Sequence, residues 1–156
     1  MQVVLSQTPT IVTKALVIGM SNAVCATFSC VFATVSKDDS LVNVERRLSS
    51  LHVRTDIELL GAILSDMSAS RVSHKSTKVC LEHLHDALTV LNASLQSMDD
   101  HVRQQRRSLV GYWNWKRGGA GEGEELSRLL ALVEDEKASL DHHMRRFMEV
   151  RTMRFE

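Results

Sequence analysis

Histidine is the residue in this chain whose type most directly suggests chemistry, because an imidazole can bind a metal ion or move a proton near neutral pH. The chain has seven histidines. His83 and His85 lie two positions apart, and His142 and His143 are adjacent. Neither pair has the spacing of three or four residues that places two ligands on one helix face. The spacing therefore predicts no metal site, and we expect these histidines on solvated helix faces.

The cysteines and the glycines give no catalytic motif. Cys25, Cys30 and Cys80 are an odd number without CxxC spacing, which predicts small buried side chains in a reducing compartment. No motif places a thiol or hydroxyl beside a base. The glycine-rich stretch 116–123 lacks the Gly-Lys-Ser/Thr ending of a phosphate-binding loop. We expect no enzymatic activity, no catalytic residue, no cofactor and no small-molecule substrate.

A basic and aromatic segment, residues 103–117, is the strongest candidate for binding. It holds five Lys or Arg side chains, no carboxylate, one tyrosine and two tryptophans. Tryptophan and tyrosine favour a bilayer interface, and each cation near an anionic leaflet gains about 1 kcal/mol. The alternative is that a tryptophan caps the core while the arginines are solvated or pair with Glu122 to Glu125. The candidate contacts with lipid head groups are Arg103, Arg106, Arg107, Trp113, Trp115, Lys116 and Arg117.

The charge balance argues against a nucleic-acid partner. The chain has 19 Lys and Arg against 19 Asp and Glu in 156 residues, so its formal net charge is zero, and no global field attracts it to a polyanion. With one proline, seven glycines and 44% hydrophobic residues, the composition favours one helical domain over disorder or an all-β fold.

An uncharged segment near the N-terminus is the most unusual element. No charged residue occurs from Ala15 to Val35, a length that matches the roughly 20 residues of a membrane-spanning helix. Small side chains recur at steps of three and four residues, so another helix could approach closely. Three interpretations stay open: a core helix expected to be the most buried of the bundle, a helix that moves from the bundle into a membrane, and a secretory signal or anchor. The candidate membrane-inserting residues are Leu16, Val17, Ile18, Gly19, Ala23, Val24, Phe28, Val31 and Phe32.

The rest of the chain shows helical periodicity. Leucines and other apolar residues from Cys80 to Val102 repeat at steps of three and four residues, which predicts one long amphipathic helix. Residues 40–67 predict a further helix, either continuous with a stutter or broken near His52 to Thr55. We therefore expect an all-α, antiparallel four- to five-helix bundle with an apolar N-terminal helix. The expected elements of this single domain, 1–156, are helices at 9–36, 40–67, 76–108 and 124–152 and an aromatic, glycine-rich loop at 109–123.

The order of these motifs resembles a known class of helical domains. The leucine repeat from Cys80 to Leu95, the Trp113-x-Trp115-Lys116 motif and the final repeat from Leu126 through Lys137 to Leu140 are similar to the N-terminal domains of fungal NLR-type (STAND) receptors. More broadly they resemble the HeLo-like cell-death class, which includes the four-helix domain of mixed lineage kinase domain-like protein and the plant powdery-mildew-resistance coiled-coil domains. The resemblance spans about residues 10–150.

The resemblance implies a function. It implies a cytoplasmic domain that oligomerises, relocates to the plasma membrane, binds anionic lipids and permeabilises the bilayer through its N-terminal helix, in programmed cell death of the innate-immunity or allorecognition type. The alternative is a non-enzymatic adaptor module that associates with itself or with a partner helix without entering lipid.

Overall fold

A computed structural model describes residues 2–67, 74–107 and 124–152, with side chains described from residue 12 onward. These residues form five α-helices and one short 3₁₀ helix, and no strand occurs among them. The elements are α1 (Gln2–Ser36), η1 (Asp39–Leu41), α2 (Val42–Ser50), α3 (Val53–Asp66), α5 (Lys75–Arg107) and α7 (Glu124–Thr152).

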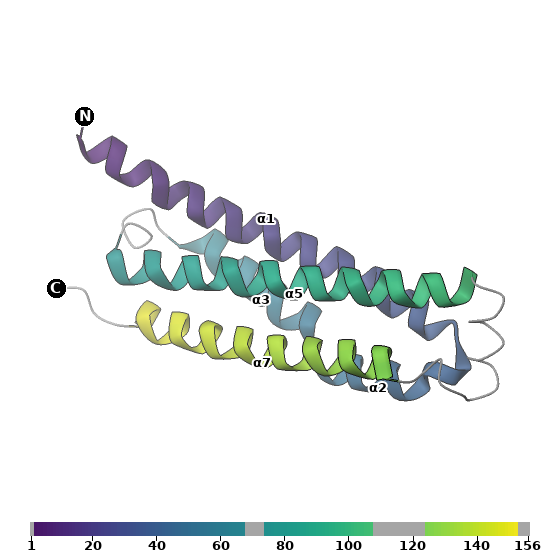
Figure 1. Ribbon diagram of the computed structural model, residues 1–156. Helices are drawn as coiled ribbons and strands as arrows, with labels where there is room; N and C mark the ends of the chain where they lie inside the picture. The colour runs from purple at the N-terminus through teal and green to yellow at the C-terminus, as the bar shows by residue number, and fades with distance from the viewer. Residues whose placement is uncertain (1, 68–73, 108–123, 153–156) are drawn as a thin grey trace.

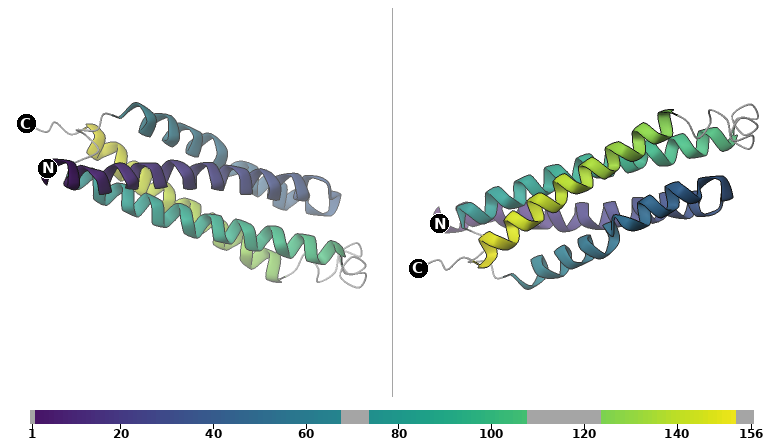
Figure 2. Two further views of the ribbon diagram at one scale, coloured as in Figure 1. Left: turned by 90° about the horizontal axis from the view of Figure 1, so that it is seen from above. Right: turned by 90° about the horizontal axis from the view of Figure 1, so that it is seen from below.

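The helices form an antiparallel bundle in which α2 and α3 together make one of four columns (Figure 1). α1 packs against α5 and α3, and α5 packs in turn against α7 (Figure 2). The start of α1 and the end of α7 lie at one end of the bundle, and the N-terminal turns of α1 project beyond it (Figure 1). The predicted all-α bundle with an apolar N-terminal helix is confirmed.

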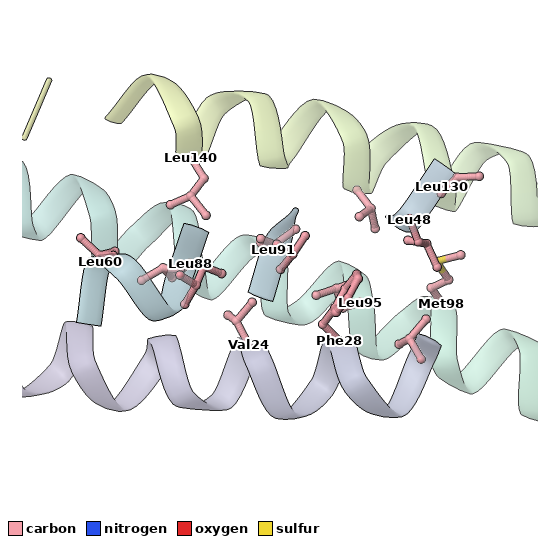
Figure 3. Close-up of a cluster of buried hydrophobic side chains, with 14 of the residues drawn as sticks. Val24, Phe28, Leu48, Leu60, Leu88, Leu91, Leu95, Met98, Leu130 and Leu140 are labelled. Atoms are coloured by element: carbon pink, nitrogen blue, oxygen red, sulfur yellow. The ribbon is translucent and has the colours of Figure 1, made fainter. Parts of the chain in front are cut away.

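A single core of aliphatic side chains holds the columns together. The α5 leucines at 84, 88, 91 and 95 have no exposed surface, as their repeat of three and four residues predicts. Figure 3 shows the α5 leucines at 88, 91 and 95 among core residues of the other columns: Val24 and Phe28 of α1, Leu48 and Leu60 of α2 and α3, and Leu130 and Leu140 of α7. Burying a leucine fully contributes about 1.5–3 kcal/mol, so α5 is the helix around which the bundle is organised.

The N-terminal helix is longer than the sequence predicts. The Thr8-Pro9 pair suggests a helix start at residue 9, but α1 begins at Gln2 and Pro9 lies inside it. The expected boundary is therefore wrong. Proline removes one backbone hydrogen bond of a helix, and α1 contains Pro9 in its first turns.

The region expected as a helix at 40–67 is divided into η1, α2 and α3. Asp38 stops the first helix and caps the next turn, since its carboxylate accepts from the Ser40 backbone nitrogen at 3.0 Å. His52 separates α2 from α3 with a left-handed backbone, φ 51°. That conformation is unfavourable for a residue with a Cβ atom. The broken-helix alternative is therefore the correct one, and the break moves the apolar stripe of α3 into phase with the core.

A lysine occupies the core position that interrupts the apolar stripe of α7. The Lys137 side chain is 2% exposed, and its Nζ lies 2.9 Å from Asp56 Oδ2 of α3 and 2.6 Å from Asp141 Oδ1 of α7. Both aspartates are only half-buried, so their outer oxygens reach the surface of the bundle. The lysine thus spans the seam between α3 and α7, and a buried charge without partners would be strongly unfavourable there.

Replacing Lys137 separates the contribution of its stem from that of its charge. We expect Lys137→Ala to lower the free energy of unfolding by about 2–5 kcal/mol, because it leaves a cavity in the core. Lys137→Met keeps the volume and removes the charge, so its change should stay within about 1.5 kcal/mol. Urea unfolding followed by circular dichroism measures both values. Equal destabilisation by the two variants would show that the ion pairs, and not the packing, stabilise this position.

Candidate membrane-interaction surface

The face of α1 that points away from the bundle carries no charged side chain from Val12 to Ala33. Its two large apolar side chains are about half exposed, Leu16 at 52% and Val12 at 48%. From Leu16 to the end of α1, the exposed positions carry mostly small side chains. We call this exposed set the outer face of α1: Val12, Ala15, Leu16, Gly19, Asn22, Ala26, Cys30 and Ala33.

The opposite face of α1 is part of the core. Val17, Val24 and Val31 have no exposed surface, and Phe28 is 8% exposed. These residues recur at steps of seven, four and three, so they form one stripe toward α5 and α3. If α1 were removed as a signal segment, this stripe would leave the core, so its packing favours α1 as a retained part of the folded bundle.

From residue 12 onward, α1 has the smallest share of exposed residues among the described helices, as expected, but its burial is confined to one stripe. The segment Val12–Ser36 is long and apolar enough to cross a membrane, and 28% of its most apolar window is buried inside the protein. A helix can bury only the stripe that its neighbours cover, and α1 has neighbours on one side alone. The small-residue stripe therefore faces outward, where the sequence analysis allowed a position in the core.

Three hydroxyl groups of α1 bond to the backbone of the helix itself. Ser21, Thr27 and Thr34 each donate to the backbone carbonyl four residues earlier, at 2.8, 2.9 and 2.9 Å. A hydroxyl bonded in this way needs no water partner. These residues dilute the apolar content of the segment, yet their hydrogen bonds are compatible with an environment that excludes water.

Polar contacts hold α1 in the bundle at both ends of its apolar stretch. At the start, Lys14 Nζ donates to the Met67 carbonyl at the end of α3, at 3.3 Å. At the far end, Thr34 Oγ1 of α1 lies 3.3 Å from Asp99 Oδ1 of α5. Asp99 also accepts from Arg103 Nε at 2.9 Å. These contacts are few and partly exposed. They fix the position of α1 in the bundle, but breaking them to release α1 costs little free energy.

The predicted inserting residues divide between the two faces of α1. Leu16 and Gly19 are exposed, and Ile18, Ala23 and Phe32 are half-buried. The remaining four lie in the core in this conformation, so they can meet a membrane only if α1 leaves the bundle. These four are Val17, Val24, Phe28 and Val31.

The predicted head-group contacts are only partly placed. Arg103 is exposed and half-buried Arg106 lies 4.0 Å from Asp38. Both stand at the end of the bundle where α1 ends (Figure 1), a position that suits an interfacial anchor, although each is paired with a carboxylate. Arg107 ends α5, and its side chain is outside the described set. Trp113, Trp115, Lys116 and Arg117 lie outside the described residues.

The cysteines differ in their surroundings, and the expectation of three buried thiols is wrong for Cys30. Cys25 and Cys80 are half-buried, and burial raises the pKa of each thiol above its usual range. Cys30 is exposed on the outer face of α1. The apolar sequence around Cys30 suggests burial, but its angular position on the helix decides the outcome.

The structure brings together histidines that the sequence keeps apart. The His83 ring of α5 lies 5.5 Å from the His143 ring of α7, and His142 lies 5.6 Å from His143, measured between centroids. Sequence spacing within one helix could not show this meeting across two helices. Among residues 2–67, 74–107 and 124–152, no three His, Cys, Asp or Glu side chains form a group that could hold a metal ion.

Comparisons with protein-family models, with curated proteins and with solved structures give no match to this chain.

The histidine cluster predicts that the bundle loses stability in mild acid. Burial, followed by the charges of His83 and His142, lowers the pKa of His143 below its usual range. A base with a lowered folded-state pKa contributes stability above its unfolded pKa of about 6.5 that is lost as the pH falls toward the folded value. We expect the urea midpoint of the wild type to fall from pH 7.5 to 5, and to fall less in His143→Gln.

The wild type must be compared with His143→Gln because a carboxylate also lies near the histidine cluster. Glu136 lines the same hollow as His83 and His143, and because burial raises the pKa of its carboxyl, its own titration also changes stability with pH. The difference between wild type and His143→Gln isolates the imidazole, and identical pH profiles would contradict the prediction.

Proposed function

We propose that this protein is a membrane-acting helical bundle of the cell-death-inducing type, in which α1 leaves the bundle on oligomerisation and enters an anionic membrane. In this proposal it acts without enzymatic chemistry, resides in the cytoplasm and relocates to the plasma membrane. The observation that carries the proposal is the uncharged outer face of α1, on a segment of 25 residues long enough to span a bilayer.

The outer face supports a first contact with lipid before any helix moves. Val12 and Leu16 are half-exposed, so covering each gains about 1 kcal/mol at 25 cal/mol per Å² of apolar surface. No residue between Lys14 and Lys37 carries a charge that would have to be desolvated. The face can therefore lie in the membrane interface while the core stripe stays packed on α5.

Full insertion requires the core stripe of α1 to exchange protein contacts for lipid contacts. Valine and phenylalanine side chains at 17, 24, 28 and 31 are as compatible with acyl chains as with leucines, so this exchange costs little at α1 itself. The larger cost is at α5, whose leucines lose their cover. Packing of several released bundles against one another would restore that cover, so oligomerisation is part of the proposal.

One observation favours the adaptor function as a second candidate. A Cβ atom built on Gly19 would meet nothing within 4 Å, and alanines occupy the positions around it on the outer face. Small residues at such spacing allow two helix backbones to approach closely in water as well as in lipid. A second copy of this chain could therefore cover the same face without a membrane.

A charge on the outer face distinguishes membrane action from loss of folding. We expect Ala26→Glu to abolish dye release from anionic liposomes, because a carboxylate in the centre of an inserted helix costs several kcal/mol. Ala93→Glu, on an exposed position of α5, is the matched control and should keep wild-type release. Val24→Asp is unsuitable, because Val24 is fully buried and its substitution would unfold the bundle.

Liposome leakage and oligomeric state then separate the two candidate functions. Leakage by the wild type that is lost in Ala26→Glu supports membrane action. A folded wild type that gives neither leakage nor co-sedimentation with anionic liposomes contradicts it. In that case, a dimer in solution that Ala26→Glu dissociates would support the adaptor.

Reversing two charges tests the basic end of the bundle. We expect Arg103→Glu with Arg106→Glu to weaken co-sedimentation with anionic liposomes by roughly ten-fold or more, because two attractive contacts of about 1 kcal/mol each become repulsive. Binding to neutral liposomes should not change. Arg54→Glu with Arg146→Glu, at exposed positions away from the end of α5, gives a control of equal charge, and an equal loss in both variants would contradict a specific anchor.

A further inference from the structure

A hollow lies between α5 and α7, and no residue of α1 contributes to it. Its volume is about 270 Å³, and it is open to solvent. Antiparallel packing of α5 and α7 brings together residues about 50 positions apart in the chain (Figure 1). Its lining is His83, Asp86, Ala87 and Val90 of α5 and Glu136, Ser139 and His143 of α7.

The polar groups of the hollow share one chemical property. Asp86 and Glu136 are carboxylates, which only accept hydrogen bonds when ionised, and neutral imidazoles and a hydroxyl each offer an acceptor as well. No lysine or arginine lines the hollow within the part of the chain that the structure describes. The charge of the lining is therefore negative and has no internal counter-ion, so the complementary ligand is a cation.

One carboxylate oxygen of Glu136 lacks a hydrogen-bond donor. Its Oε1 accepts from Ser94 Oγ at 2.8 Å, whereas its Oε2 is buried and has no hydrogen-bond partner. Burial raises the pKa of this carboxyl, and the hydrogen bond from Ser94 opposes that rise. A buried carboxylate oxygen without a donor costs about 1–3 kcal/mol or more, and a small rotation of the carboxylate would present this oxygen to a donor in the hollow.

The apolar part of the lining sets the shape of the ligand. Ala87 is half-buried and Val90 is 50% exposed, and together they form an apolar wall on α5. The imidazole rings of His83 and His143, tilted by 57° to one another, lie in the same lining. A flat or aliphatic group can pack against this wall while its charged end meets the carboxylates.

We propose that this hollow binds a small organic cation, a primary ammonium group carried on a short aromatic or aliphatic body. The ammonium would donate to Glu136 and Asp86, and the body would cover Ala87 and Val90. This inference is independent of the proposed membrane function, because it uses no residue of α1 and requires no lipid.

The size of the hollow limits the ligand and its affinity. A volume of about 270 Å³ is near the lower end for a ligand site, so it suits a molecule of about ten non-hydrogen atoms. At about 0.3–0.5 kcal/mol per atom, such a ligand binds with a dissociation constant on the order of 0.1–10 mM. Phenethylamine is an appropriate probe, and 2-phenylethanol is its uncharged counterpart of nearly equal shape.

Titration followed by amide chemical shifts measures such weak binding residue by residue. With the folded full-length protein, we expect phenethylamine to shift the amide signals of Ala87, Val90 and Ser139 and to bind at least ten-fold more tightly than 2-phenylethanol. Glu136→Gln should weaken phenethylamine binding at least ten-fold and leave 2-phenylethanol unaffected. Glu149→Gln, an exposed carboxylate of α7 outside the lining, is the matched control and should bind as the wild type does.

A second variant tests the site without altering Glu136. Val90→Lys places a cation at an exposed position of the rim, so it should occupy the carboxylates and abolish phenethylamine binding while the protein stays folded. Equal affinity for the amine and the alcohol would overturn the proposal. It would also be overturned by shifts confined to other residues, by no shifts at all, or by unchanged amine binding in Glu136→Gln.

Discussion

A helix in a four-column bundle can bury only the stripe that faces its neighbours, and α1 carries apolar side chains all the way round. This constraint shapes the rest of the structure. Because α5 and α3 cover one side of α1, Val24 and Phe28 enter the core while Leu16 stays half-exposed. The bundle therefore leaves part of the apolar surface of α1 outside the core.

The polar interactions of α1 differ from those that join the other helices. Ser21, Thr27 and Thr34 turn their hydroxyls back to the α1 backbone, so α1 depends on few polar partners outside itself. By contrast, Lys137 needs carboxylates from both α3 and α7 and cannot leave its site without losing them. The polar interactions that are hardest to break therefore join α3 to α7, whereas α1 is held chiefly by apolar contact.

Periodicity predicted the long helices well, because the side chains that fill a core must repeat at the pitch of the helix. The leucines from Leu84 to Leu95 and the bounds of α7 illustrate this. The direction that each face of α1 takes was not predictable, since apolar residues on every side leave no contrast in the pattern. The left-handed His52 was equally hidden, because a histidine gives none of the signals of glycine or asparagine.

The candidate sites show the same limit more strongly. Spacing within one helix could not place His83 beside His142 and His143, because that contact depends on the register between α5 and α7. The hollow with Glu136 depends on the same register. Features built from two helices become visible only when the packing is known.

The contacts between helices also bear on the order in which the bundle assembles. Ser94 and Glu136, which join α5 to α7, are 42 positions apart, whereas Asp56 and Lys137, which join α3 to α7, are 81 apart. Closing the longer loop costs more chain entropy and is the slower step. α5 and α7 are then expected to pair early, and the seam between α3 and α7 is expected to close late. The buried Lys137 charge therefore acquires its second carboxylate only when the bundle is nearly complete.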